Sequence, residues 1–206
     1  MKKDNNFLGK FLLYLFTLFS VFYMLFTCII FLKCYAASRT TAGFLDQEFL
    51  RFKIYGSTSN FEGNTVSATI SIIDSNGNEI AVIERSWSGS YLAVEFAQVR
   101  LNGSYYIFPS RIYGKNRIIE EKRERRLGTR LEKYYTDNNQ CMLAGYGSTY
   151  SQRKALYVIS ALATRRYPIM TFGTTTSYAV DLSNCLTDRY YSIRIDEKLN
   201  IVIDEL

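Results

Sequence analysis

The chain has 206 residues and a formal net charge of +6, because 25 Lys and Arg outnumber 19 Asp and Glu. Hydrophobic residues make up 48% and charged residues 21%, which excludes a fully disordered chain and allows one domain plus an accessory segment. The sequence has no His, which excludes His-dependent catalytic triads and most mononuclear zinc sites. We therefore expect neither a metal site nor a cofactor.

An apolar stretch near the N-terminus runs for 22 residues without a charge, from Phe11 to Leu32. At about 1.5 Å per helical residue it is about 33 Å long, which is enough to cross a hydrocarbon core of about 30 Å. Charged residues, Lys10 and Lys33, lie at both ends. The pattern predicts a transmembrane signal anchor at residues 11–32, preceded by a leader at residues 1–10.

Two other interpretations of this stretch stay open. A cleaved signal peptide would use the small residues Ala36 and Ala37, although its apolar region is usually only about 7–15 residues long. A lipoprotein signal would use Cys28, although the apolar run continues beyond that residue. The length of the run favours the anchor over both.

The charges beside the span predict its orientation. Three Lys precede the span, and Lys33 and Arg39 follow it, so the positive-inside rule slightly favours a cytoplasmic N-terminus. A short leader before a large C-terminal part is also typical of a signal anchor. We expect residues 33–43 to form a short tether and residues 44–206 to form one extracytoplasmic domain.

The four Cys divide between the anchor and the domain. Cys28 lies in the span and Cys34 at its edge, which leaves Cys141 and Cys185 in the domain. An oxidising compartment allows such a pair to bond. With 43 intervening residues, a bridge would contribute roughly 3–4 kcal/mol in the chain-entropy model. The sequence predicts a disulfide between Cys141 and Cys185, with two separate buried thiols as the alternative.

Polar and apolar residues alternate with a period of two from Val66 to Ile72, which is typical of a strand with one buried face. Turn sequences then follow at Asn76-Gly77, Ser88-Gly89 and Asn102-Gly103. They predict an antiparallel meander of four strands. These strands are expected at about 66–72, 79–87, 91–101 and 104–108, the last ending before Pro109.

The segment 111–135 is strongly basic, with nine Lys or Arg against four Glu. We expect a helix here, with Leu127, Leu131 and Tyr134 as its apolar stripe. Its basic cluster would bind an anion, such as a lipid head group, a wall polymer or an acidic partner, or would be a solvated helix face. The cluster consists of Lys122, Arg123, Arg125, Arg126 and Arg130.

A second helix is predicted after the capping-box pair Thr149 and Gln152, and it ends before Pro168. Its apolar stripe consists of Ala155, Leu156, Ile159, Leu162 and Ala163. Further strands are expected at about 177–182, 189–196 and 200–204. Strands followed by helices and again by strands indicate an α+β fold.

Ser151 and Lys154 form an S-x-x-K pattern at the start of this second helix. Penicillin-binding proteins and related serine hydrolases place a nucleophile beside its Lys at this spacing. The helix N-terminus would stabilise an oxyanion, and a desolvated Lys would act as the base. Because the S-x-N and K-T-G motifs of that family are absent, a His-free serine hydrolase is the alternative and not the main hypothesis.

Tyrosine doublets occur at three positions in the domain. Neighbours on a strand face opposite sides, so we expect one Tyr of each doublet in the core and the other on the surface. Exposed Tyr would suit a glycan- or solute-binding module, which is the second alternative. The doublets are Tyr105-Tyr106, Tyr134-Tyr135 and Tyr190-Tyr191.

The sequence as a whole favours a single-pass membrane protein of the cell envelope. We expect its exported domain to have a non-enzymatic interaction or scaffolding role. Its partners would be the lipid bilayer and either another envelope protein or the membrane surface. Nucleic acid is not expected, because the basic cluster would lie outside the cytoplasm.

Overall fold

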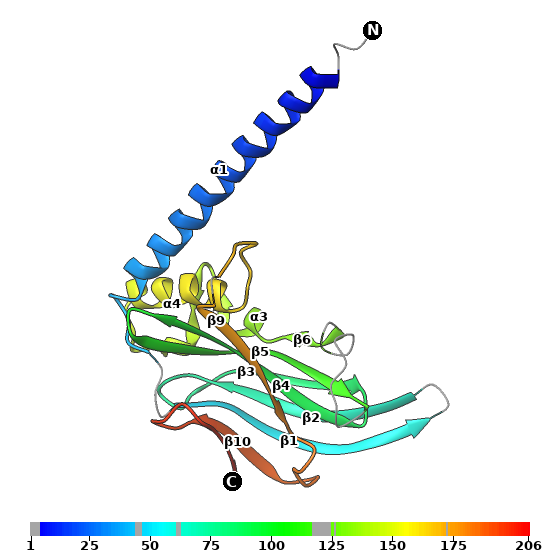
Figure 1. Ribbon diagram of the computed structural model, residues 1–206. Coiled ribbons are helices and arrows are strands. Elements are labelled where there is room, and N and C mark those ends of the chain that lie inside the picture. Colours follow the sequence, from blue (N-terminus) through cyan, green and yellow to red (C-terminus); the bar gives the residue numbers. More distant parts are fainter. Residues whose placement is uncertain (1–4, 44–46, 61–62, 117–124, 126, 172) are drawn as a thin grey trace.

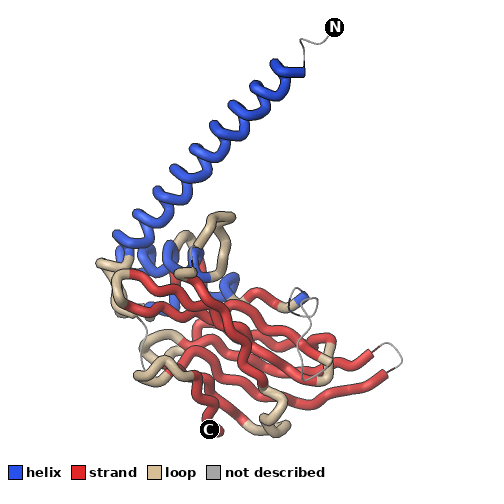
Figure 2. Tube along the Cα trace, viewed as in Figure 1, coloured by secondary structure: helices blue, strands red, loops and turns tan. Residues whose placement is uncertain are grey.

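The computed structural model confirms the α+β layout, with a long apolar helix followed by antiparallel sheets, short helices and C-terminal strands (Figure 1). Helices lie on one side of the strands, next to the long helix (Figure 2). The structure describes residues 5–43, 47–60, 63–116, 125, 127–171 and 173–206.

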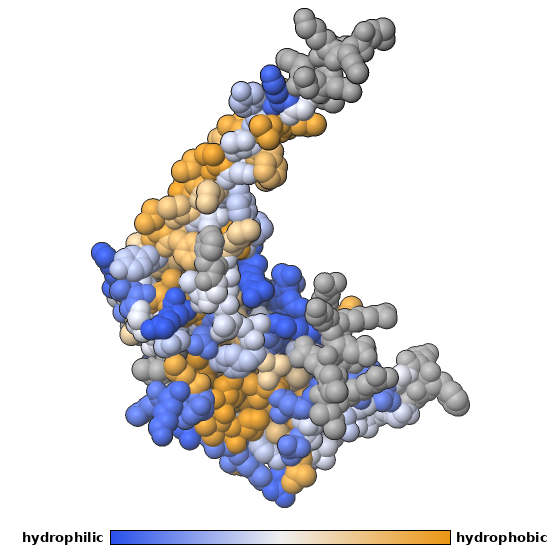
Figure 3. Space-filling model, viewed as in Figure 1, coloured by the Kyte–Doolittle hydropathy of each residue, from blue (hydrophilic) through white to orange (hydrophobic). Residues whose placement is uncertain are grey.

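The long helix, α1 (Asn5–Ala37), contains the apolar stretch and projects away from the rest of the molecule (Figures 1 and 3). Its part Gly9–Ala37 is long and apolar enough to cross a membrane, and little of it is buried. The prediction of an N-terminal helix able to span a bilayer is therefore confirmed.

The strands form two main antiparallel sheets, with the order β11-β10-β1-β2-β3 in the five-stranded sheet and β6-β5-β4-β9 in the four-stranded sheet. The five-stranded sheet consists of β1 (Gln47–Asn60), β2 (Gly63–Ile73), β3 (Glu79–Ser88), β10 (Tyr190–Ile195) and β11 (Ile201–Glu205). The four-stranded sheet consists of β4 (Tyr91–Leu101), β5 (Ser104–Lys115), β6 (Thr129–Arg130) and β9 (Thr175–Asp181). A small hairpin joins β7 (Thr136–Asp137) to β8 (Gln140–Cys141).

The four predicted strands of the meander correspond to β2, β3, β4 and β5, and they are divided between the two sheets. The turn at Ser88 and Gly89 carries the chain from one sheet to the other. A Cβ on Gly89, which has φ 136°, would lie 2.4 Å from the backbone nitrogen of Lys115, and one on Gly114 would lie 2.2 Å from the Ser88 carbonyl oxygen. Glycine at both positions lets this turn approach the end of β5.

Two strands differ from the prediction. The fourth predicted strand continues through Pro109 to Lys115, because the register shifts opposite Pro109 between Glu95 and Phe96, and a bulge tolerates proline. The sequence analysis did not predict β1, although this strand pairs with both β2 and β10. Register shifts within β1 interrupt its period of two, which obscures the strand pattern.

The main core lies between the two sheets. The ring of Phe49 on β1 meets that of Phe96 on β4 edge to face, with centroids 6.2 Å apart, and Phe96 also stacks on Tyr178 of β9 at 6.1 Å. One Tyr of each doublet is buried, as predicted. The buried members are Tyr106, Tyr135 and Tyr191.

The helix α4 (Tyr150–Ala163) covers the other side of the four-stranded sheet (Figure 1). The predicted capping box forms. The backbone N–H of Gln152 donates to the Thr149 hydroxyl at 3.3 Å, and the backbone N–H of Thr149 donates to the side-chain oxygen of Gln152 at 2.8 Å. The predicted apolar stripe is buried. A single short turn, η1 (Met142–Ala144), precedes α4.

The helix expected over residues 111–135 is not continuous in the described part of this segment, where only Arg125, Leu127 and Glu132–Tyr135 are helical. Its first residues belong to β5, and β6 pairs with β5 before the short helix α3 (Glu132–Tyr135) begins. Leu131 is buried, but Leu127 and Tyr134 are 75% and 40% exposed. The predicted stripe is therefore wrong, because edge pairing with β5 replaces helical packing.

The last turns of α1 pack against α4. Ile30 and Cys34 are buried, and the Cys34 thiol lies 3.8 Å from the Val158 carbonyl oxygen of α4. The segment predicted as a tether thus begins as the end of α1. The turn that follows is held to β5, where the buried Tyr106 hydroxyl lies 2.9 Å from the Thr41 carbonyl oxygen and 3.2 Å from that of Ser38.

Removing the Tyr106 hydroxyl tests this connection. In Tyr106→Phe, two carbonyl groups lose a partner in a buried position, so we expect the free energy of unfolding to fall by about 1–3 kcal/mol. Protease cleavage after the exposed Arg39 is expected to accelerate. Tyr105→Phe, on the adjacent position of β5, serves as the control and should change the free energy of unfolding by less than about 0.5 kcal/mol. Equal effects of the two variants would contradict the role given to the Tyr106 hydroxyl.

Candidate functional site

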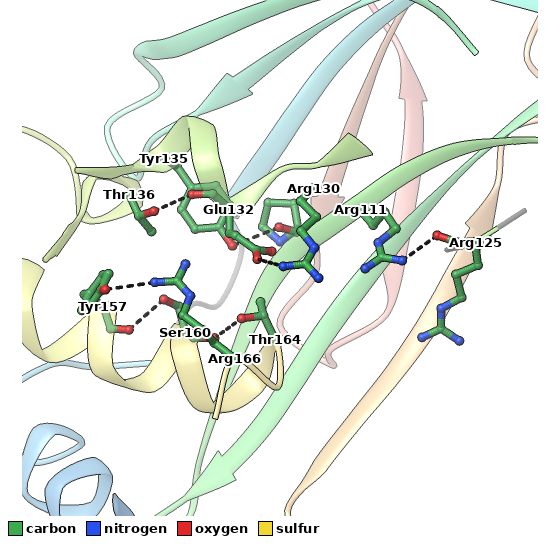
Figure 4. A network of polar contacts seen from close by, with 11 residues as sticks. Arg111, Arg125, Arg130, Glu132, Tyr135, Thr136, Tyr157, Ser160, Thr164 and Arg166 are labelled. Atoms are coloured by element: carbon green, nitrogen blue, oxygen red, sulfur yellow. Dashed lines mark hydrogen bonds and ion pairs between the residues drawn. The ribbon is translucent and has the colours of Figure 1, made fainter. Parts of the chain in front are cut away.

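Four arginines from separate parts of the chain lie in succession along β5, α3 and the C-terminal end of α4, and the Arg125 guanidinium points away from the other three (Figure 4). Arg111 on β5 and Arg130 on β6 are direct partners in the sheet register. Arg125 comes from the segment between these strands, and Arg166 follows α4. We call these four residues the arginine cluster.

Two acidic residues balance part of this charge. Glu95, on β4, forms a two-pronged ion pair with the Arg125 guanidinium, with 2.8 Å between Arg125 Nε and Glu95 Oε2. Glu132 is the first residue of α3, and its Oε1 atom lies 3.9 Å from Arg130 Nη1. Of the described residues, these four guanidinium groups and two carboxylates carry a net charge of +2, which suits an anion electrostatically.

The remaining contacts hold the cluster to the backbone and to α4. Arg111 Nη1 donates to the carbonyl oxygen of Arg125 at 2.6 Å. Arg166 lies over the Tyr157 ring, 5.2 Å from its centroid, and donates to the Tyr157 hydroxyl at 3.0 Å. The first contact joins β5 to the segment that contains Arg125, and the second fixes Arg166 against α4.

Burial changes the acid–base properties of the groups around the cluster. Desolvation raises the pKa of the Glu132 carboxyl above its ordinary value, although Arg130, Arg166 and Arg111 act in the opposite direction. Burial also raises the pKa of the Cys141 thiol to about 12. Cys141 therefore stays protonated near neutral pH, which makes it a poor nucleophile.

The raised pKa of Glu132 predicts a pH-dependent stability. The pKa of Glu132 is higher in the folded chain than in the unfolded chain. Between these two values the folded chain binds more protons than the unfolded chain. The free energy of unfolding therefore falls as pH rises through this range. Glu132→Gln removes the titrating group and should flatten this part of the profile. Denaturation of the detergent-solubilised chain between about pH 4 and pH 8 measures the effect.

The exposed Glu84 of β3 provides the matched control. Glu84→Gln should keep the slope of the original chain. A slope that persists in Glu132→Gln would show that Glu132 is not its source.

The structure brings together only part of the predicted basic cluster. Arg125 and Arg130 belong to the arginine cluster, while Lys122, Arg123 and Arg126 lie outside the described residues. The sequence analysis missed Arg111 and Arg166. One signal could have pointed to Arg166: residues 138–180 contain four basic residues and no Asp or Glu.

Two cavities in the domain are small, and one of them lies in the arginine cluster. One of about 50 Å³ lies beside Arg125, between Glu95, Thr164 and Ser177. Another of about 150 Å³ lies at one end of the two sheets and is lined in part by Cys185. Pockets for drug-sized ligands usually have about 300–1,000 Å³, so these cavities suit water or a small ion.

The predicted disulfide does not form in the structure. Cys141 is buried beside α4 in the small β7-β8 hairpin, whereas Cys185 lies in the chain between β9 and β10. All four cysteines are free thiols. The structure thus corresponds to the alternative of separate thiols, and a disulfide no longer supports the exported location.

The predicted Ser151 and Lys154 pair lies at the exposed start of α4. Lys154 Nζ is 5.9 Å from the centroid of the Tyr150 ring, and both side chains of the pair face solvent. A Lys base needs desolvation to lose its proton near neutral pH. The geometry here does not supply that desolvation.

The less buried members of the tyrosine doublets, half-buried Tyr105 and exposed Tyr134 and Tyr190, lie on three different elements, namely β5, α3 and β10. They therefore do not form one aromatic platform. Among the described residues, no three His, Cys, Asp or Glu side chains are grouped so that they could hold a metal ion.

Comparisons with known proteins add no relative to this picture. No family model, curated protein or solved structure matches the chain.

Proposed function

We propose that the protein is a single-pass membrane protein whose exported α+β domain has a non-enzymatic interaction role at the bilayer surface. In this proposal α1 crosses the membrane with its N-terminus in the cytoplasm. The observation that carries the proposal is the continuity of α1, which extends beyond the apolar stretch and buries Cys34 against α4. A domain joined in this way has a fixed orientation relative to its anchor.

The fixed orientation favours the five-stranded sheet as the surface for a protein partner. Figure 1 shows α4 next to α1, the four-stranded sheet below it and the five-stranded sheet farthest away. On the outer face of that sheet, Lys53 lies between the rings of Tyr55 and Tyr190, at 5.5 and 5.4 Å from their centroids. Both Tyr are more than 40% exposed. Exposed Tyr is enriched at protein interfaces.

Site-specific photocrosslinking in the native membrane tests the interaction role. A benzophenone amino acid at Tyr190 should give a discrete protein adduct, which should weaken when Tyr55 is replaced by Ala on the same face. The same probe at Tyr146, an exposed residue before α4, is the control and should not give this adduct. Identical adducts at both positions, or none at Tyr190, would contradict an interaction through this face.

Protease protection tests the orientation separately. In right-side-out vesicles from the native membrane, added protease should digest the domain without lysis. Protection of the domain until the vesicles are opened would place it in the cytoplasm and contradict the proposed topology.

A further inference from the structure

We propose that the loop between α4 and β9 binds the surface of an anionic phospholipid bilayer. We call its described residues, 164–171 and 173–174, the α4–β9 loop. The exposed Arg165 would contact lipid phosphates and Met170 would enter the interfacial region, while Arg166 stays with Tyr157 in the arginine cluster. This inference rests on the proposed function, because it requires α1 to span the membrane.

The first argument is the position of the loop beside α1. The loop leaves the end of α4 and rises on the side of the molecule from which α1 projects (Figure 1). Tyr167 and Ile169 are half-buried and pack against the buried cluster to which Ile30 and Cys34 of α1 also belong. The loop therefore lies next to the last turns of the anchor.

The second argument is the depth at which α1 becomes buried. Thr27 is only 6% exposed, and it precedes Leu32, the end of the apolar stretch, by about 7.5 Å along the helix. The protein thus covers one side of α1 at a level that the bilayer boundary would reach, while Phe26, Ile29 and Leu32 on its other sides stay exposed. A surface at this level must contact lipid head groups when α1 spans the membrane.

The third argument is the chemistry of the loop. Met170 is 61% exposed, and Arg165, Arg166 and Pro168 are exposed as well. Arg side chains place their guanidinium groups at phosphates while neighbouring apolar groups enter the interface. An exposed Arg and an exposed Met in one loop match an anionic bilayer better than the surface of a solvated loop.

The fourth argument is the distribution of charge along the fold. Residues 138–180, which include α4 and the α4–β9 loop, carry four basic and no acidic residues. Residues 181–206, which form β10 and β11 in the distant five-stranded sheet, carry six acidic and three basic residues. An anionic membrane attracts the basic segment 138–180 and repels the acidic segment 181–206. The charge distribution therefore favours the same orientation as the α1–α4 packing.

Tryptophan quenching in nanodiscs tests the inference on the full chain. Met170→Trp places a probe in the loop, while the native Trp87 is 4% exposed and gives a constant background. In discs of phosphatidylcholine with one third phosphatidylglycerol, brominated acyl chains should quench the added fluorescence at least about two-fold, because the probe lies at the interface. The quenching should diminish in neutral discs, at high salt, and in the variant Arg165→Gln.

Leu186→Trp provides the matched control, because Leu186 is 55% exposed and lies in the chain before β10. Its fluorescence should be equal in all discs. Absence of quenching at position 170 in anionic discs would overturn the inference. Equal quenching in neutral discs and in Arg165→Gln would also overturn it, since α1 alone would then set the position of the loop. Failure of the chain to enter nanodiscs is a different result, which would contradict the membrane-spanning role of α1.

Discussion

Replacing Phe96 with Ala is expected to lower the free energy of unfolding by about 3–5 kcal/mol. Phe96 is fully buried and contacts both Phe49 of the opposite sheet and Tyr178 of the neighbouring strand. Truncation removes aromatic surface from the core and leaves a cavity between the sheets. Denaturation of the detergent-solubilised chain, followed by the fluorescence of the buried Trp87, measures the loss.

Two variants make this result specific. Phe96→Leu keeps most of the volume and should cost clearly less than Phe96→Ala. Tyr146→Ala removes an aromatic ring that is 70% exposed and should change the free energy of unfolding by less than about 0.5 kcal/mol. A cost below about 1 kcal/mol for Phe96→Ala would contradict a core built between the two sheets.

A charge at Cys34 is expected to separate α1 from α4. Cys34 is fully buried against the Val158 carbonyl group, and an unpaired carboxylate there would cost several kcal/mol. Cys34→Asp should therefore expose the turn after α1, in which the amide of Ser38 donates to the Cys34 carbonyl oxygen. A local loss of about 2 kcal/mol corresponds to an increase in hydrogen exchange on the order of 30-fold.

The neighbouring position supplies the control for this variant. Tyr35 belongs to the same helical turn but is 42% exposed, so Tyr35→Asp adds the same charge without burying it. Its hydrogen exchange should stay within a few fold of that of the original chain. If Cys34→Asp exchanges no faster than Tyr35→Asp, α1 is not held by its contact with α4.

Local patterns predicted most of the elements because they report local physics. The alternation from Val66 to Ile72 identified β2, and the Thr149 and Gln152 pair identified the start of α4. The division of the strands between two sheets could not be predicted in this way. It depends on the turn at Gly89, whose close contact with the end of β5 joins residues distant in the sequence.

The candidate site was predicted less well, because it is assembled by tertiary contacts. Charge density along the chain pointed to Arg125 and Arg130, but it could not show that Glu95 pairs with Arg125. Arg166 reaches the site only because α4 ends beside β5 and α3. The predicted Cys141 and Cys185 bridge failed for the same reason, since spacing in the sequence does not determine proximity in the fold.

The most direct test of the account concerns the rigid connection between the anchor and the domain. Double electron–electron resonance in nanodiscs would measure the distance between spin labels on the exposed Cys28 of α1 and on Tyr190→Cys, with Cys185 replaced by Ser. Cys34 and Cys141 are fully buried and should not react. We predict one narrow distance distribution, which broadens in Cys34→Asp. A broad distribution in the chain with Cys34 intact, unchanged by Cys34→Asp, would contradict the fixed orientation on which the proposed function depends.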